Sequence, residues 1–228
     1  MKIIYTIILS IAFVFVGCES KHEEQHKHGD NHANQHMHHR PVADLVVEFE
    51  KESRMKTQKP YEVIALFGDL NGKKILDIGA GSGYFTFKLA EKGATVIAGD
   101  VNDDFLAFID AKIEKENLTA KITTKKLPFD SPSLSKEEVD GVLIVNTYHH
   151  IENRVNYFAA VKNGLKPNGV LMVVDFMKKE FEEKVEGPPY KMRISSERVM
   201  EELKEAGFDK FEVNKELLPY QYIIKAMK

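Results

Sequence analysis

The amino-acid sequence predicts an α/β protein with a doubly wound, mostly parallel sheet. Three observations lead to this fold class. Short apolar runs alternate with helical patterns from residue 74 to the C-terminus. The first of these runs, 74–78, is followed at 79–83 by three glycines that alternate with small residues. The run 141–145 is continuously apolar, as expected of a parallel strand that is covered on both faces.

The elements before the sheet are expected to be helices. Residues 41–57 carry Val42, Leu45, Val46 and Phe49 at helical spacing, which predicts an amphipathic helix. Pro60 opens a second short helical pattern at 61–67. These helices either cover a bound ligand or simply pack on the sheet.

The first half of the sheet follows from alternating patterns. Strands are expected at 74–78, 95–98 and 120–124, with helices at 83–91 and 103–116 between them. In the second helix Phe105, Leu106, Ile109 and Ile113 face inward. Asp103 and Asp104 lie at its positive end, where the helix dipole favours acids.

The second half continues the alternation and ends in a strand pair. Strands are expected at 141–145 and 170–174, with a helix at 152–163 between them. Ser195 is the expected N-cap of a further helix, and Gly207 is its expected C-terminal cap. The terminal runs 208–213 and 220–226 predict two more strands.

The N-terminal residues 1–18 have the pattern of a signal or lipoprotein leader. Lys2 precedes an apolar run at 3–16, which is shorter than the roughly 20 residues of a spanning helix. Cys18 is the sole cysteine and follows Gly17, an arrangement that resembles a lipobox, although Phe15 and Val16 depart from its usual residues. We expect attachment to the membrane through a lipidated Cys18 on the periplasmic side. The alternative is an uncleaved anchor with the domain on the cytoplasmic face.

Residues 19–40 form a low-complexity linker that is expected to be disordered. It holds seven of the nine histidines: His22, His26, His28, His32, His36, His38 and His39. Neutral imidazoles bind transition metals, so a weakly bound divalent ion is one interpretation, and a solvated spacer is the other. The remaining residues, 41–228, are expected to form one domain.

The composition argues against one class of partner. The net charge of −3 gives no broad electrostatic attraction for nucleic acid, and no nucleic-acid partner is expected.

The glycine loop predicts a nucleotide-cofactor site. Alternating glycines allow a tight turn and a close approach to a ligand, and the next helix offers free N–H groups there. The dinucleotide pattern G-x-G-x-x-G is incomplete, because its third glycine is replaced by Tyr84 in one frame and by Thr86 in the other. A nicotinamide-dependent oxidoreductase is therefore disfavoured, and the Lys and Ser/Thr that close a phosphate-binding P-loop are missing.

The pattern D-x-G-x-G-x-G at 77–83 resembles motif I of class I S-adenosylmethionine-dependent methyltransferases. The likeness extends to 96–100, 139–146 and the Leu-Lys-Pro-Asn-Gly turn at 165–169, and so covers about residues 60–228. It implies a seven-stranded Rossmann-like sheet of order 3-2-1-4-5-7-6 with the last strand antiparallel. Residues 36–38 and 58–60 further resemble a bacterial group of such enzymes with lipoprotein-like leaders.

The resemblance also implies a cofactor, S-adenosylmethionine, and the residues that hold it. The glycine loop would pass under its methionyl part, with Asp77 near the ammonium group, and Asp100 would accept from the ribose hydroxyls. The family's acid after strand 3 is missing, which leaves Asp130 or a backbone amide for the adenine. The residues expected to bind the cofactor are Asp77, Gly79, Ala80, Gly81, Gly83, Tyr84, Asp100, Val101, Asp130 and Asn146.

The segment after the fourth strand is expected to face the acceptor. It reads Asn-Thr-Tyr-His-His at 146–150 and lacks the Pro-Pro motif of amino-directed DNA and protein methyltransferases. His149 or His150 could act as a base if the acceptor must lose a proton, and each could instead be structural. Tyr148 either lines the acceptor pocket or packs in the core. Lys191 and Arg193 suggest an anionic acceptor, against the alternative of an ordinary proline-rich loop.

The sequence therefore predicts a membrane-tethered methyltransferase that acts on a small-molecule or lipid-associated acceptor by in-line methyl transfer. The alternative is an exported, non-catalytic binding protein that keeps the fold and binds metal through its histidine-rich tail.

Overall fold

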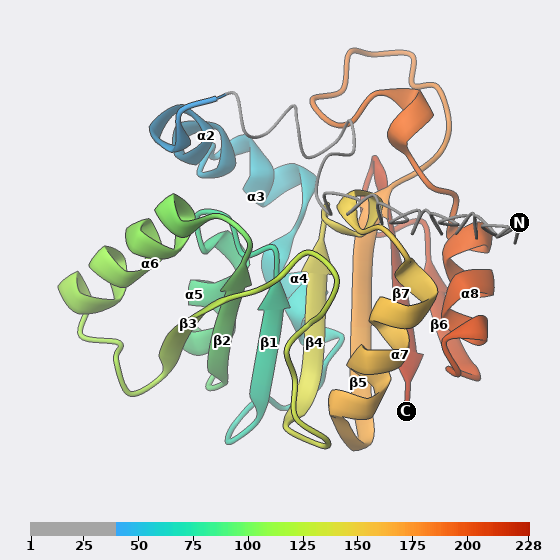
Figure 1. The fold of residues 1–228 in the computed structure, drawn as a ribbon. Coiled ribbons are helices and arrows are strands. Elements are labelled where there is room, and N and C mark those ends of the chain that lie inside the picture. Colours follow the sequence, from blue (N-terminus) through green and yellow to red (C-terminus); the bar gives the residue numbers. More distant parts are fainter. Residues whose placement is uncertain (1–39) are drawn as a thin grey trace, which may run out of the picture.

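The computed structural model describes residues 40–228 of the chain (Figure 1). The expected leader with Cys18 and the histidines of the 19–40 linker lie outside these residues, so the predictions made for them stay predictions. Within 40–228, no helix is both long and apolar enough to cross a membrane.

A seven-stranded sheet in the order β3-β2-β1-β4-β5-β7-β6 forms the centre of the molecule. Strands β1 to β5 are parallel to one another, and β7 runs antiparallel to both of its neighbours. The strands are β1 (Lys74–Ile78), β2 (Thr95–Asp100), β3 (Ile122–Lys126), β4 (Val139–Val145), β5 (Leu165–Phe176), β6 (Lys210–Asn214) and β7 (Gln221–Met227). The predicted fold class, strand order and antiparallel last strand are confirmed.

Helices cover both faces of the sheet, because successive side chains of a strand point to opposite sides. Ile75 of β1 packs in one apolar cluster with α4, α5 and α6, whereas Leu76 packs in the other with α7 and α8. These helices are α4 (Pro60–Ala65), α5 (Tyr84–Glu91), α6 (Asp103–Lys115), α7 (Arg154–Gly164) and α8 (Ser196–Glu205).

The helix ends follow the local sequence signals. The side chain of Asn102 caps α6 by accepting from the backbone N–H of Asp104 at 2.9 Å. Ser195 caps α8 by accepting from the N–H of Arg198, and Gly207 follows that helix with a φ of 99°. The predicted caps of α8 are thus confirmed.

Two expected elements differ from the prediction by more than two residues. The helix expected at 41–57 is divided into α2 (Val42–Phe49) and α3 (Ser53–Thr57), because the Phe49 carbonyl accepts from the Arg54 guanidinium instead of a following backbone N–H. The strand expected at 170–174 begins earlier, at Leu165, and includes the residues of the expected turn at 165–169. In this part its pairing with β4 is irregular, and Asn168 has a φ of 64°.

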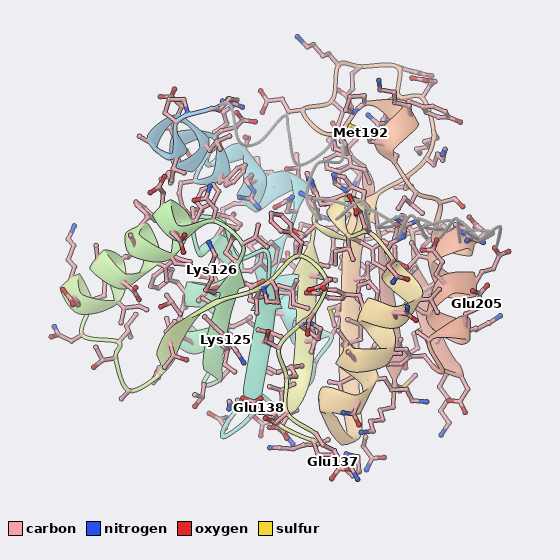
Figure 2. All side chains as sticks on the ribbon, viewed as in Figure 1. Lys125, Lys126, Glu137, Glu138, Met192 and Glu205 are labelled. Atoms are coloured by element: carbon pink, nitrogen blue, oxygen red, sulfur yellow. The ribbon has the colours of Figure 1, made fainter. Side chains whose placement is uncertain are left out.

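The carboxyl ends of the parallel strands meet at one edge of the sheet, where ligands bind in open α/β folds. Figure 1 shows α2 and α3 above the β1 and β2 part of this edge, and the segment 177–195 above β5 and β7. That segment includes the short helix η2 (Tyr190–Met192), and Figure 2 marks Met192 on it above the strand ends. Another short helix, η1 (Tyr148–His150), follows β4.

Candidate active site

The glycine loop after β1 adopts a backbone that favours glycine at each of its three positions. Gly79, Gly81 and Gly83 have φ values of 73°, 55° and 79°. The loop is pinned to β2, because the amides of Gly79 and Ala80 both donate to the Gly99 carbonyl, at 2.8 and 3.1 Å. The result is a fixed turn whose surface is backbone rather than side chain.

Asp100, the last residue of β2, holds this loop from the side. Its carboxylate accepts from the backbone N–H of Gly81 and from that of Asn102, each at 2.9 Å. Burial raises the pKa of Asp100, and these bonds, with one from the Val101 amide, act in the opposite direction. A carboxylate has lone pairs for about four hydrogen bonds, so Asp100 can also accept from ligand hydroxyls.

Asp77 lies in β1, directly before the loop, and is 3% exposed. The Thr86 hydroxyl of α5 donates to it at 2.7 Å. Burial raises the pKa of Asp77 to about 6, and the charge of Asp100 acts in the same direction. Arg54 and the Thr86 hydrogen bond lower it. Asp77 is therefore a buried carboxylate whose charged form a nearby cation would stabilise.

The N-terminal helices lie against the glycine loop. The Phe49 ring is 3.3 Å from the position that a Cβ on Gly81 would take, and it stacks on Phe105 of α6 at 5.8 Å between centroids. Glu50 accepts from the Ser82 hydroxyl at 2.6 Å. These contacts favour a role for the N-terminal helices in covering a bound ligand over simple packing on the sheet.

Arg54 of α3 and Tyr84 of α5 form a polar group beside the loop. The Arg54 guanidinium lies 4.1 Å from the centre of the Tyr84 ring, and the Lys88 ammonium lies 3.6 Å from it. Burial lowers the pKa of Arg54, and the charges of Glu50 and Asp77 oppose that shift. Among the described residues the Tyr84 hydroxyl is buried without a hydrogen-bond partner. A buried hydroxyl without a partner is costly, so this group suits a ligand that accepts a hydrogen bond.

The end of β4 joins the loop to the acceptor side. The Thr147 side chain fills the space into which a Cβ on Gly79 would project. Asn146 has a φ of 55°, and its side-chain oxygen accepts from Gln221 of β7. Asn146 was expected to bind the cofactor, but its side chain is tied toward β7, and Thr147 is the residue of this segment that contacts the loop.

His149 and Asp175 form an oriented pair at the ends of β4 and β5. The Nδ1 atom of His149 lies 3.0 and 2.9 Å from the two carboxylate oxygens of Asp175. Because an ionised carboxylate only accepts, Nδ1 donates to it, and in the neutral imidazole the lone pair is then on Nε2. Asp175 is itself fixed by the backbone N–H of Phe176 at 2.7 Å. This arrangement orients Nε2 to accept a proton.

His150 occupies a different environment. Its ring packs on His149 at 4.4 Å between centroids, and burial, with the neighbouring His149, lowers its pKa to about 4. It is therefore neutral at physiological pH and supports the His149 ring. Of the two histidines considered as a base, the geometry favours His149.

Tyr148 lies in the core and is 0% exposed. Its ring stacks on Phe158 at 4.8 Å, and its hydroxyl donates to Glu202 of α8 at 2.8 Å. Its pKa is raised by burial and by that carboxylate. The structure favours the packing alternative for Tyr148 over a role in lining the acceptor site.

A pocket of about 510 Å³ lies between η1, the segment 177–195 and the start of α8; we call it the basic pocket. His149 and Ser195 line it together with an apolar wall of Ile151, Met192 and Ile194. Six charged side chains complete the lining: Glu152, Arg154, Lys178, Lys191, Arg193 and Arg198. Its volume is in the range of small-molecule sites.

The adenine contact expected of Asp130 finds no support in the geometry. Burial raises the pKa of Tyr157 in α7, and the charge of Asp130 acts in the same direction, so this carboxylate lies toward that helix. Lys126, labelled in Figure 2, stands where the family has its acid and pairs with Asp103 at 2.7 Å. The backbone alternative for an adenine contact stays open.

Arg54, Thr147 and Asp175 complete the site, and the sequence alone assigns a role of its own to none of the three. Asp175 follows an apolar strand, a position that does mark ligand sites in this fold class. Arg54 and Thr147 carry no such signal, since an isolated arginine in a polar helix and a threonine in a loop are common. Within residues 40–228, no three His, Cys, Asp or Glu side chains are grouped as metal ligands.

The residues around the glycine loop fit the groups of S-adenosylmethionine. A buried carboxylate, Asp77, suits an ammonium group, and Asp100 has lone pairs left for ribose hydroxyls. The Tyr84 hydroxyl, beside the Arg54 guanidinium, suits a carboxylate. The chain thus offers a partner for each polar group of the amino-acid and ribose parts of that cofactor.

Comparison with known proteins gives a consistent result. Residues 76–173 match a family model described as a methyltransferase domain. A demethylmenaquinone methyltransferase of Tropheryma whipplei is 30% identical over 112 residues, which are 49% of this chain and 45% of that protein. A ubiquinone biosynthesis O-methyltransferase of Dinoroseobacter shibae is 31% identical over 101 residues, 44% of this chain and 40% of that protein.

Among solved structures, an S-adenosylmethionine-dependent methyltransferase from Aquifex aeolicus superposes with a TM-score of 0.72 at 24% identity. The match covers 82% of this chain and 98% of that one, and it shows a shared fold. The chain spans less than half the length of the two curated relatives that it matches.

Proposed function

We propose that this chain is an S-adenosylmethionine-dependent methyltransferase that acts on a small-molecule or lipid-associated acceptor. The observation that carries the proposal is the glycine loop held by Asp100 at one side. Beside it are buried Asp77 and the Tyr84 hydroxyl, which has no hydrogen-bond partner within residues 40–228. The matched family model and the names of the relatives point to the same activity.

In this proposal the residues at the ends of β1 and β2 bind and orient the cofactor. Asp77 pairs with its ammonium group, Asp100 accepts from its ribose hydroxyls, and Tyr84 with Arg54 receives its carboxylate. The cover formed by Phe49 and Glu50 excludes water from the loop. The bound cofactor would supply a methyl group on a sulfonium, which leaves as a neutral thioether.

On the acceptor side, His149 accepts the proton of an acceptor hydroxyl at Nε2. Asp175 keeps the imidazole in the tautomer that leaves Nε2 free, and it stabilises the imidazolium that forms. Holding the acceptor oxygen in line with the transferred methyl supplies much of the remaining acceleration. An oriented His–carboxylate pair is of use mainly when the acceptor must lose a proton, so we propose a hydroxyl acceptor.

The names of two relatives support a small-molecule or lipid-associated acceptor. One is named for demethylmenaquinone, and the other is named as an O-methyltransferase of ubiquinone biosynthesis. The alternative of a non-catalytic binding protein has no comparable support.

We further propose that the leader tethers this domain to the membrane, through a lipidated Cys18 or as an uncleaved anchor. Incorporation of a labelled fatty acid into the wild-type chain, but not into Cys18→Ser, would support lipidation. Equal labelling of both chains would contradict it.

The activity is tested by mixing the full-length protein with methyl-labelled S-adenosylmethionine and a set of short-chain quinols and phenols. We expect labelled product and an equal amount of S-adenosylhomocysteine. Asp100→Ala serves as the background. Label transfer that does not exceed this background for any acceptor, together with no binding of S-adenosylhomocysteine, would refute the proposal.

A further inference from the structure

The positive charges of the basic pocket fall into two groups. Arg154 and Arg198 are paired with two carboxylates: Arg154 donates to both oxygens of Glu202, at 2.7 and 2.9 Å, and Arg198 donates to Glu202 at 3.0 Å and to Glu201 at 3.4 Å. These two guanidiniums build the wall of the pocket and have little charge left for a ligand.

The other group has no carboxylate partners among the residues that the structure describes. Arg193 is 8% exposed and donates to two backbone carbonyls, those of Pro188 at 2.9 Å and Lys179 at 2.8 Å. Within residues 40–228, Lys178 and Lys191 form no ion pair. Glu152 is the one carboxylate in the lining. The pocket therefore has an excess of positive charge with two ammonium groups available.

The rest of the lining indicates which kind of molecule would fit the pocket. Ile151, Met192 and Ile194 give an apolar wall, and His149 also lines the pocket. The helix α8 begins at the pocket, with Ser195 as its cap, so the positive end of its dipole adds to the lysine charges.

We propose that the basic pocket binds an acceptor that carries an anionic carboxylate or phosphate group on an apolar body. Lys178 and Lys191 pair with the anionic group, the carbon skeleton packs on the apolar wall, and the methyl-accepting hydroxyl reaches His149. The role of the bound molecule as acceptor rests on the proposed function, whereas the binding of the anion does not.

The test uses the full-length protein and three probes that differ in one group: benzoate, phenyl phosphate and benzamide. Their affinities are measured by ligand-observed NMR, with and without S-adenosylhomocysteine. Two lysine contacts predict that benzoate or phenyl phosphate binds roughly fivefold tighter than benzamide at low salt. This preference shrinks as the salt concentration rises. The tighter of the two anions identifies the group.

Two double variants locate the effect. Lys178→Gln with Lys191→Gln should abolish the preference for the anions and leave benzamide binding unchanged. Lys56→Gln with Lys184→Gln removes the same charge from exposed positions outside the pocket and should keep the preference.

Equal binding of all three probes, or a preference that survives in the first double variant, would overturn the inference. A titration with S-adenosylhomocysteine separates this from the proposed function. If the cofactor product fails to bind while the anion preference is present, the proposed activity is wrong and the anion site stands. If the product binds and the preference is absent, the anion site is wrong.

Discussion

The cofactor side and the acceptor side of the site are built in different ways. Around the glycine loop, the backbone and the buried carboxylates come from residues 77–100, one continuous stretch. Other segments add to it the side chains of Phe49, Glu50, Arg54 and Thr147. The basic pocket is built from side chains of three separate segments: residues 149–154, the segment 177–195 and the start of α8. The first is local in sequence and tightly fixed. The second depends on how distant parts of the chain pack.

This difference distinguishes a cofactor site of a kind that many proteins share from a pocket that is specific to one ligand. A backbone cradle binds a cofactor that many proteins share, and it tolerates few changes. A pocket made of exposed lysines and apolar side chains can change its ligand without disturbing the sheet. Changes on the two sides should therefore have separable effects, on cofactor affinity in one case and on turnover or acceptor choice in the other.

The largest difference between the effect on turnover and the effect on cofactor affinity is expected for His149→Gln. Loss of the base should lower kcat by about 10²- to 10⁴-fold, because proton removal is no longer assisted. The affinity for S-adenosylhomocysteine should stay the same, because His149 does not touch the glycine loop. Steady-state kinetics and calorimetry measure the two quantities.

His150→Gln is the matched control, since that ring is buried and neutral, and its turnover should exceed that of His149→Gln by at least tenfold. Equal losses of turnover in the two variants would show that His149 and His150 both have a structural role.

Asp100→Ala should instead affect the cofactor side of the site. Loss of the ribose contacts is expected to weaken cofactor binding about 100-fold, since hydrogen bonds to a charged group contribute about 1.5–3 kcal/mol. The amides of Gly81 and Asn102 also lose their acceptor, so the free energy of unfolding should fall by about 1–3 kcal/mol.

Benzoate binding in the basic pocket should be unchanged in Asp100→Ala. Asp103→Ala, which removes an exposed acid that pairs with Lys126, should change neither the cofactor affinity nor the binding of benzoate. Unchanged cofactor affinity in Asp100→Ala would remove this residue from the site.

The smallest effect is a pH dependence of cofactor affinity. The pKa of Asp77 is raised to about 6, so lowering the pH from 7.5 to 5 protonates it and removes the partner of the ammonium group. Affinity should then fall about tenfold. The sign for stability is opposite: a raised pKa in the folded state means that the ligand-free protein gains stability from this group as the pH falls from about 6 to 4.

Titrations at several pH values check this dependence. Asp77→Asn should bind weakly with a nearly flat profile, and a profile as steep as that of the wild type would assign the titration to another group.

The sequence predicted those features that depend on neighbouring residues. The strands, the glycine loop and both carboxylates of the cofactor side lie within short segments whose patterns have direct physical causes. The errors of one to five residues at strand ends and the divided N-terminal helix reflect tertiary contacts, such as that between Arg54 and the Phe49 carbonyl.

The acceptor side could not be predicted in the same way. His149 and Asp175 are 26 residues apart, and Tyr148 and Glu202 are 54 residues apart, so no local pattern pairs them. Tyr148 and His149 are adjacent, yet one is buried against α8 and the other lines the basic pocket. Only the packing of η1 and α8 on the sheet decides which of them faces a ligand.

The central claim is that the loop after β1 binds S-adenosylmethionine. The most direct test is calorimetric titration of the full-length protein with S-adenosylmethionine, S-adenosylhomocysteine and NAD. We predict micromolar binding of the first two and no binding of NAD. Binding of NAD, or of none of the three, would contradict the claim.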